Sequence, residues 1–202
     1  VTSESISAQT PLAASGSYTI TRNITLPSSA TTGNRFLLFK ADGSGNQGET
    51  NENNNVRAVP LTIGLPDLEV SAASAPTVAG VGDTISVSWT VRNSSPTFQA
   101  ALDWYDHIYL SSDGVLDDAD AYLNNLYISA QTPLTAGGEY TVSRNVTIPG
   151  NTPTGSRYLL FVADRDNYQR ETNETNNTRA VAIQLGSADL TVTASAPSSA
   201  TV

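Results

Sequence analysis

Oxygen-bearing side chains are concentrated in two segments of this 202-residue chain. The first runs from Asp113 to Asp120 and contains four carboxylates, those of Asp113, Asp117, Asp118 and Asp120. Calcium takes about six to eight oxygen ligands from carboxylates, amides and backbone carbonyls. Crowded carboxylates also repel one another unless a cation lies between them. These four residues are therefore candidate calcium ligands, although their spacing is not that of an EF-hand loop.

The second segment extends from position 164 to position 177 and mixes carboxylates with amides. Its candidate calcium ligands are Asp164, Glu171, Asn173, Glu174 and Asn177. Asp and Asn also form turns by accepting hydrogen bonds from nearby backbone amides, with no metal involved. Both interpretations stay open for the two segments, and turn formation is favoured for the second.

The residues typical of catalysis are scarce. His107 is the only histidine, the chain has no cysteine, and no Gly-x-Ser-x-Gly motif occurs. A nucleophile needs a base within hydrogen-bonding reach, and short-looped β-domains offer no deep cleft for a carboxylate pair such as Asp103 and Asp106. We therefore expect no enzymatic activity.

One further modification site is expected. Asn93 begins an Asn-x-Ser triplet near the end of an expected strand. If the host glycosylates such triplets, Asn93 is the expected carrier of the glycan.

The charge of the chain excludes several partners. The formal net charge is −9 and the isoelectric point is about 4.4. A negative surface repels nucleic acid and anionic lipid, so neither is expected as a partner. No run of apolar residues is long enough to cross a bilayer, so we expect no membrane insertion in this segment. Without cysteine, stability must come from packed cores, metal or neighbouring domains.

An internal repeat is the strongest pattern in the sequence. Ser7-Ala8-Gln9-Thr10-Pro11-Leu12 recurs unchanged 122 residues later (129 − 7) as Ser129-Ala130-Gln131-Thr132-Pro133-Leu134. Two further pairs of segments match at the same offset, 35–39 with 157–161 and 49–55 with 171–177. Such a period indicates repeated structural units.

The offset predicts the domain boundaries. Residues 65–186 form one complete repeat, 1–64 the C-terminal half of a preceding repeat, and 187–202 the start of a following one. We interpret the chain as part of a longer array. The alternative is that partial repeats of different chains complete one another, but both pieces lack the stretch equivalent to 82–122.

The complete repeat is expected to be all-β. Alternation of apolar and polar residues, bounded by Gly, Pro, Asn and Ser, predicts strands. Seven are expected, at 68–72, 84–93, 103–110, 122–128, 140–148, 157–163 and 179–185. The apolar run at 157–163 indicates a central strand, and Trp89 and Trp104 are expected in the core. Seven strands in a repeat of about 122 residues are typical of an immunoglobulin-like or fibronectin-III-like β-sandwich.

The repeat resembles the CARDB family, the cell-adhesion-related domain found in bacteria. The matching residues are Pro66-Asp67-Leu68, the run Val87-Ser88-Trp89-Thr90-Val91-Arg92-Asn93, the segment from His107 to Asp113, and the closing phrase from Glu171 to Asn177. The resemblance implies a seven-stranded sandwich, usually in tandem, on secreted or surface-displayed proteins. It implies no particular ligand.

These observations predict an extracellular structural or adhesive protein, in which copies of the domain stack end to end as a stalk or fibre. The topology is expected to place the turn at 113–120 at one end of the domain and the loop at 164–177 at the other. Calcium between successive copies could then stiffen the junction. The alternatives are an adhesin module that binds a glycan or protein of a host or other cell surface, and an accessory domain of a larger secreted enzyme.

Overall fold

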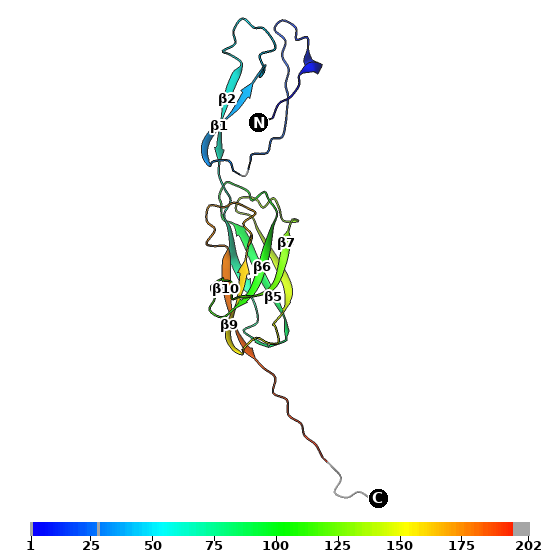
Figure 1. Cartoon of the computed structure of the whole chain (residues 1–202), viewed down its shortest axis with the longest axis vertical. Helices are drawn as coiled ribbons and strands as arrows, with labels where there is room; N and C mark the ends of the chain where they lie inside the picture. Colours follow the sequence, from blue (N-terminus) through cyan, green and yellow to red (C-terminus); the bar gives the residue numbers. More distant parts are fainter. Residues whose placement is uncertain (1, 28, 196–202) are drawn as a thin grey trace, which may run out of the picture. The chain divides into compact units, whose positions relative to one another are not determined.

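The computed structural model describes residues 2–27 and 29–195 and divides into two compact units, Val1–Ile63 and Gly64–Val202. Each unit is considered separately. Figure 1 shows the strands of the second unit gathered in two facing layers, whereas the first unit contains one hairpin and long irregular segments. In the described part of the chain, no helix has the length and apolar character needed to cross a bilayer.

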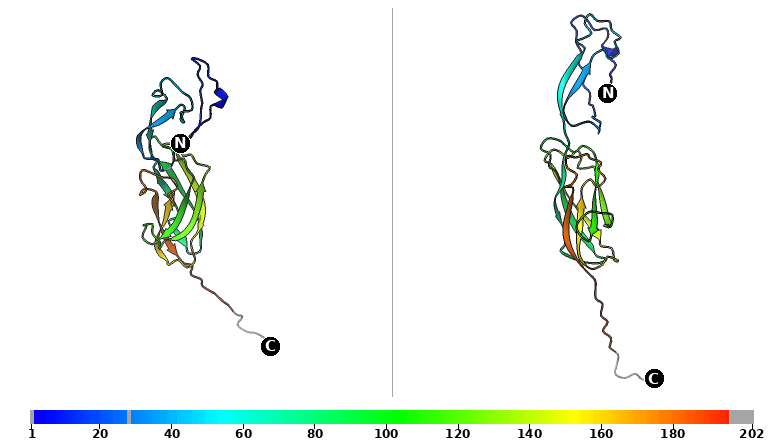
Figure 2. Two further views of the ribbon diagram at one scale, coloured as in Figure 1. Left: turned by 45° about the horizontal axis from the view of Figure 1, so that its top comes forward. Right: turned by 60° about the vertical axis from the view of Figure 1, so that its left-hand side comes forward.

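The second unit is a β-sandwich. One sheet has three strands in the order β3-β5-β8, namely β3 (Leu68–Ser74), β5 (Thr84–Asn93) and β8 (Glu139–Thr147). The other has five strands in the order β4-β10-β9-β6-β7, namely β4 (Val78–Gly80), β10 (Thr178–Gly186), β9 (Gly155–Val162), β6 (Trp104–Ser111) and β7 (Ala121–Ile128). Figure 2 shows both sheets from two further directions. The all-β sandwich predicted from the sequence is confirmed.

All seven expected strands are present, and β4 is an eighth. It pairs in parallel with the end of β10, where Val78 lies opposite Gln184. With only three residues, β4 is too short to show an alternating pattern, which is why the sequence did not reveal it.

The core lies between the two sheets. Alternate residues of β5, from Ile85 to Val91, are buried, as expected for a strand with one face on the core. Strand β9 instead buries four consecutive residues, Leu159–Val162, and pairs with β10 on one side and β6 on the other. The prediction of a central strand here is confirmed, as is the burial of Trp89 and Trp104.

The connections leave the sandwich at two opposite ends. The β9–β10 connection lies beside the start of β3, since the Thr172 amide donates to the Pro66 carbonyl at 3.0 Å. The β6–β7 connection begins after Ser111, which lies opposite Tyr158 near the beginning of β9. The two acidic segments of the sequence are therefore at opposite ends of this unit.

Within its described residues, 2–27 and 29–63, the first unit has one 3-10 turn, η1 (Ser7–Gln9), and one hairpin, formed by β1 (Gly33–Lys40) and β2 (Val56–Ile63). Gly33 pairs with Ile63 at one end of the hairpin and Lys40 with Val56 at the other. At the end of the chain, residues 187–195 form no strand. The remainder of the expected third repeat, 196–202, lies outside the described residues.

Candidate functional site

The acidic turn at 113–120 uses its carboxylates to hold its own backbone. Asp113 Oδ1 accepts from the Val115 amide at 2.9 Å, and Asp117 Oδ1 accepts from the Ala119 amide at 2.8 Å. Asp120 Oδ2 accepts from the Asp117 amide at 3.0 Å. These bonds are the ones by which aspartates stabilise turns without metal.

The loop between β9 and β10 contains a buried glutamate. Glu171 Oε2 accepts from the Leu68 amide at the start of β3, and its Oε1 accepts from Asn177 Nδ2 at 2.9 Å. The Glu171 amide donates to Glu174 Oε1 at 3.0 Å, and Asn173 Oδ1 accepts from the Thr175 amide at 3.1 Å. The loop is therefore tied both to itself and to the first strand of the domain.

Asp164 begins this loop in a left-handed conformation, with φ of 41°. Its two carboxylate oxygens accept from the amides of Tyr168 and Gln169, at 2.9 and 2.7 Å. Asp164 is fully buried, and burial raises its pKa to about 6 against the lowering effect of these two bonds. Nearby Glu174 and Asp166 raise the pKa further.

The same loop has features that suit a cation. Burial raises the pKa of Glu171 to about 8, and the nearby charges of Glu174 and Asp164 add to that rise. The side-chain oxygens of Asn176 and Asn177 are buried without a hydrogen-bond partner. However, the described residues contain no group of three or more His, Cys, Asp or Glu side chains arranged to hold a metal. Of the two segments, this loop offers a cation the more suitable oxygens.

The side chain of Asn93 links several backbone segments inside the domain. It is fully buried, and its Nδ2 donates to the carbonyls of Phe98, Leu134 and Thr135 at 2.8, 3.3 and 3.2 Å. Its Oδ1 accepts from the Asp67 amide at 3.1 Å. A glycan on Nδ2 would require these bonds to break, so the expectation that Asn93 carries a glycan is corrected for the folded domain.

A carboxylate lies in the core between the two sheets. Asp106 is fully buried and accepts from Trp89 Nε1 at 2.8 Å, from Trp104 Nε1 at 3.0 Å and from the Tyr140 hydroxyl at 2.7 Å. Burial raises the pKa of Asp106 to about 6, opposed by these hydrogen bonds. Burial and the Asp106 charge also raise the pKa of Tyr140. The group is enclosed by core side chains, which favours a structural role.

In the sequence, Asp106 is noticeable only because it lies three residues from Asp103, as one member of a carboxylate pair. The signal that could have identified its role is its place in the alternation of β6. Trp104, Asp106 and Ile108 occupy the same face of that strand, and the flanking residues are core residues.

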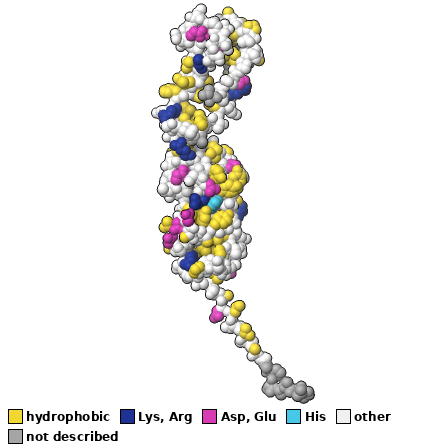
Figure 3. All heavy atoms as spheres, in the orientation of Figure 1, with side chains coloured by type: hydrophobic (Ala, Val, Ile, Leu, Met, Phe, Trp, Pro, Cys, Tyr) yellow, Lys and Arg dark blue, Asp and Glu magenta, His cyan; other side chains and the backbone are white. Residues whose placement is uncertain are grey.

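The opposite face of β6 carries an aromatic strip that the sequence patterns did not reveal. We define the aromatic strip as Tyr105, His107, Tyr109, Tyr122, Tyr127 and Tyr168. Its rings form a continuous series, from Tyr168 to Tyr105 at 6.3 Å, Tyr105 to Tyr127 at 4.8 Å and His107 to Tyr122 at 5.8 Å. Figure 3 shows hydrophobic side chains beside the cyan histidine on the second unit.

Polar groups border the aromatic strip. The Tyr127 hydroxyl donates to Asp103 Oδ2 at 2.8 Å, and His107 Nδ1 lies 3.0 Å from the Tyr109 hydroxyl. Tyr122, Tyr127 and Tyr168 are about half exposed. Exposed aromatic rings with polar edges are suited to binding, because they supply contact area at a small cost in conformational entropy. The sequence signal that could have identified the aromatic strip is the alternation along β6, where every second residue from Tyr105 to Tyr109 is aromatic.

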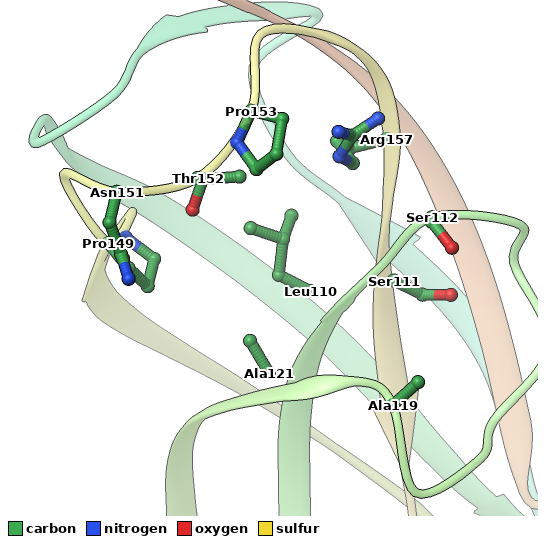
Figure 4. Close-up of a pocket in the computed structure, with 10 residues that line it drawn as sticks. All are labelled: Leu110, Ser111, Ser112, Ala119, Ala121, Pro149, Asn151, Thr152, Pro153 and Arg157. Carbon is green, nitrogen blue, oxygen red and sulfur yellow. The ribbon is translucent and has the colours of Figure 1, made fainter.

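An open pocket of about 400 Å³ lies at the end of the sandwich next to the acidic turn. Figure 4 shows Leu110 at its centre, with Pro153 and Arg157 on one side and Ala121 on the other. Its lining residues include neither a carboxylate nor a histidine. The pocket therefore brings no acid or base to a ligand.

The comparison with protein families agrees with this fold. The CARDB family model matches residues 65–181, which is more than half of the chain. The comparison with curated proteins gives no match.

Three similar solved structures illustrate the range of neighbours. A crystal structure of a CARDB domain from Pyrococcus furiosus in complex with di-metal ions is 22% identical, with a TM-score of 0.46, covering 62% of this chain and 97% of that one. A solution structure of the same domain is 20% identical, with a TM-score of 0.45 and coverages of 61% and 97%. A β-glucosidase from Listeria innocua in complex with isofagomine is 15% identical, with a TM-score of 0.40 and coverages of 62% and 17%.

The relationship rests on the family match. The matched range spans all the strands of the sandwich from β3 to β9 and enters β10. CARDB is a family of non-catalytic, adhesion-related, Ig-like domains of cell-surface or extracellular proteins. This chain belongs to the CARDB family.

Proposed function

We propose that this chain is part of an extracellular structural or adhesive protein, in which sandwich domains of one kind follow one another as a stalk or fibre. The observation that carries the proposal is that the hairpin of the first unit repeats the geometry of a hairpin of the second. Hairpin β1–β2 and hairpin β9–β10 have the same register, since Gly33 pairs with Ile63 and Gly155 with Leu185.

Several hydrogen bonds of the turn recur in both copies. Asp42, like Asp164, has φ of 41°, and its carboxylate accepts from the Asn46 and Gln47 amides at 2.9 Å each. The Glu49 amide donates to the Glu52 side chain as the Glu171 amide does to Glu174. The repeated sequence therefore specifies a repeated local structure, as expected when similar domains are joined in series.

Serial arrangement suits a structural role. Domains of the same kind form junctions of the same kind, so an array of them is a regular, extended structure. The partners are then copies of the same domain, and the acidic surface disfavours nucleic acid.

Small-angle X-ray scattering and electron microscopy of chains with two, three and four complete repeats test this proposal. We expect the maximum dimension to rise by the same increment with each added repeat. Chains that instead collapse into a compact particle would contradict a stalk or fibre.

A second candidate function is ligand binding by an adhesin, and the aromatic strip favours it. Exposed tyrosines beside polar groups can stack on sugar rings or pack on a protein surface. We expect Tyr105→Ala and Tyr127→Ala to abolish glycan-array or cell-surface binding, while Tyr18→Ala in the first unit leaves it unchanged. Equal binding by all three variants would remove the aromatic strip as the site.

Calcium forms a narrower part of the proposal, at the β9–β10 loop. Glu171, Glu174 and Asn177 would hold the ion with Asp164, and the unpartnered amide oxygens support this choice. We expect calcium to raise the unfolding midpoint of the metal-free chain, and Asn177→Ala to remove the effect. Asp117→Asn at the other acidic segment is the matched control. An unfolding midpoint that does not respond to calcium would contradict the site.

A further inference from the structure

Strand β7 leaves one edge of the five-stranded sheet unpaired. Within the described part of the chain, β7 bonds to β6 on one side and to no strand on the other, so it forms the border of its sheet (Figure 1). Backbone N–H and C=O groups along such an edge are free to pair with another strand. The edge of β7 is therefore a surface to which a further strand can add.

A short length or charged side chains protect the other three edges of the described sandwich. Strand β4 has only three residues, β3 carries Glu69, and β8 carries Glu139 and Arg144. These are features by which proteins prevent edge-to-edge pairing. By contrast, β7 has eight residues, of which none is charged and none is proline. A chain with a net charge of −9 repels its own copies, but this edge is neutral.

The central six residues of β7 read the same in both directions. The run from Tyr122 to Tyr127 is Tyr-Leu-Asn-Asn-Leu-Tyr. Consider two copies of this strand that run antiparallel about a two-fold axis between positions 124 and 125. Tyrosine then lies opposite tyrosine, leucine opposite leucine and asparagine opposite asparagine. A two-fold contact requires such self-complementarity, because each surface meets its own copy.

An irregularity in β7 turns the two halves of this run to matching faces. Residues that lie opposite each other in an antiparallel pair point to the same face, whereas successive residues of a strand alternate. In a regular strand Tyr122 and Tyr127 would lie on opposite faces. The pairing of β7 with β6 skips Leu123, and both tyrosines are about half exposed, at 53% and 50%. Leu123 and Leu126 both pack against the core. The tyrosines that would meet across the axis thus share the outer face, and the leucines share the inner one.

The same axis keeps the acidic turns of two molecules apart. It places position 120 of one molecule opposite position 129 of the other, so Asp120 meets Ser129 and not a second carboxylate. The outward tyrosines of the two strands belong to the aromatic strip, so the aromatic strips of the two molecules adjoin at the axis. Tyrosine pairs across neighbouring strands stabilise a sheet.

We infer that β7 is a lateral docking edge for the β7 strand of a second copy of this chain, in an antiparallel two-fold pair centred between Asn124 and Asn125. The two five-stranded sheets then form one continuous sheet across the contact. This contact goes beyond the proposed function, because it joins separate chains side by side whatever the order of domains within each chain. The edge of one strand is a small interface, so the association is weak and reversible.

Sedimentation equilibrium of the full chain over a concentration series tests this contact. We expect the average mass to rise from monomer towards dimer, and Asn125→Lys to weaken the association at least about tenfold. The reason is that the two-fold axis brings both lysines together, and like charges across a strand pair are destabilising. Asn125 is exposed, so the substitution does not disturb the core. Ser143→Lys, at an exposed position of the edge strand β8, is the matched control and should leave the association unchanged.

A charge-pairing experiment tests the axis itself. Asn125→Glu should weaken the association as Asn125→Lys does. An equimolar mixture of the two variants should recover it, because opposite charges then lie across the axis. This recovery also shows that each variant is folded.

A single introduced thiol provides a measurement without added charge. The chain has no cysteine, so a cysteine placed by substitution reports only its own surroundings. Under mild oxidation Asn125→Cys should form a disulfide-linked dimer, whereas Ser143→Cys should remain monomeric.

Three outcomes would overturn the inference. The first is a chain that stays monomeric over the whole concentration series; glycan binding that Tyr127→Ala abolishes in such a monomer would assign the aromatic strip to a foreign ligand. The second is association that Asn125→Lys does not weaken, since copies would then meet at another surface. The third is a mixture of the lysine and glutamate variants that associates no better than either variant alone.

Discussion

Replacing Asp106 with asparagine tests how the core tolerates a carboxylate between its sheets. The substitution keeps the size of the side chain and one acceptor oxygen, but it removes the ionisable group. Asp106 has a pKa of about 6 in the folded domain against an ordinary value of 3.8. Folding therefore favours the protonated carboxyl and disfavours the charged one.

The sign of the pH effect follows from this difference. Below pH 3.8 the carboxyl is protonated in both states, and its full contribution to stability is present. As the pH rises through 6, the folded domain must release a proton that the unfolded chain has already lost. The pKa difference of about two corresponds to a loss of about 3 kcal/mol in the free energy of unfolding. Relative to Asp106→Asn, the wild type should lose roughly that amount between about pH 4 and about pH 7.5.

Tryptophan fluorescence during urea unfolding measures this directly. The chain has two tryptophans, and both donate to Asp106, so the signal reports only the second unit. Asp164, Glu171 and His107 titrate in both proteins and cancel in the comparison. If the difference in unfolding free energy between the two proteins is the same at both ends of this pH range, burial does not raise the pKa of Asp106.

Three further substitutions test other parts of the account. Asn93→Ala should lower the free energy of unfolding by about 3 kcal/mol, since it leaves buried backbone groups without partners. An unchanged urea midpoint would show that these hydrogen bonds do not stabilise the domain. Glu171→Ala should cost about 2 kcal/mol because the Leu68 amide loses its acceptor, whereas the matched Glu49→Ala should change stability by less than about 0.5 kcal/mol; equal effects of the two would count against the contact with β3. Phe161→Ala should cost about 4 kcal/mol by opening a cavity, and a cost below about 1 kcal/mol would show that this position is not in the core.

The strands were predictable because their signal is local. Alternation along 84–93 and the apolar run of β9 reflect burial on one face or both, and each pattern lies within a single segment. The repeat also predicts that the two hairpins are equivalent, because matching residues such as Asp42 and Asp164 occupy the same positions in both. The family resemblance rested on similar local phrases and was confirmed by the family match.

The surfaces and polar contacts were less predictable because they join residues distant in the sequence. Glu171 meets Leu68 across 103 positions, and Asn93 meets Leu134 across 41. Nothing in the Asn-x-Ser triplet indicates that Asn93 turns inward, so the triplet by itself predicts an exposed residue. The aromatic strip likewise appears only when β6, β7 and the β9–β10 loop lie side by side.

The central claim is that the second unit is one complete sandwich that folds without the first. Its most direct test compares the urea unfolding of residues 64–202 alone with that of the full chain, using tryptophan fluorescence. Since both tryptophans lie in the second unit, we expect the two free energies of unfolding to agree within about 0.5 kcal/mol. A shortened chain that is unfolded, or that is less stable by more than about 2 kcal/mol, would show that the two units share one interior.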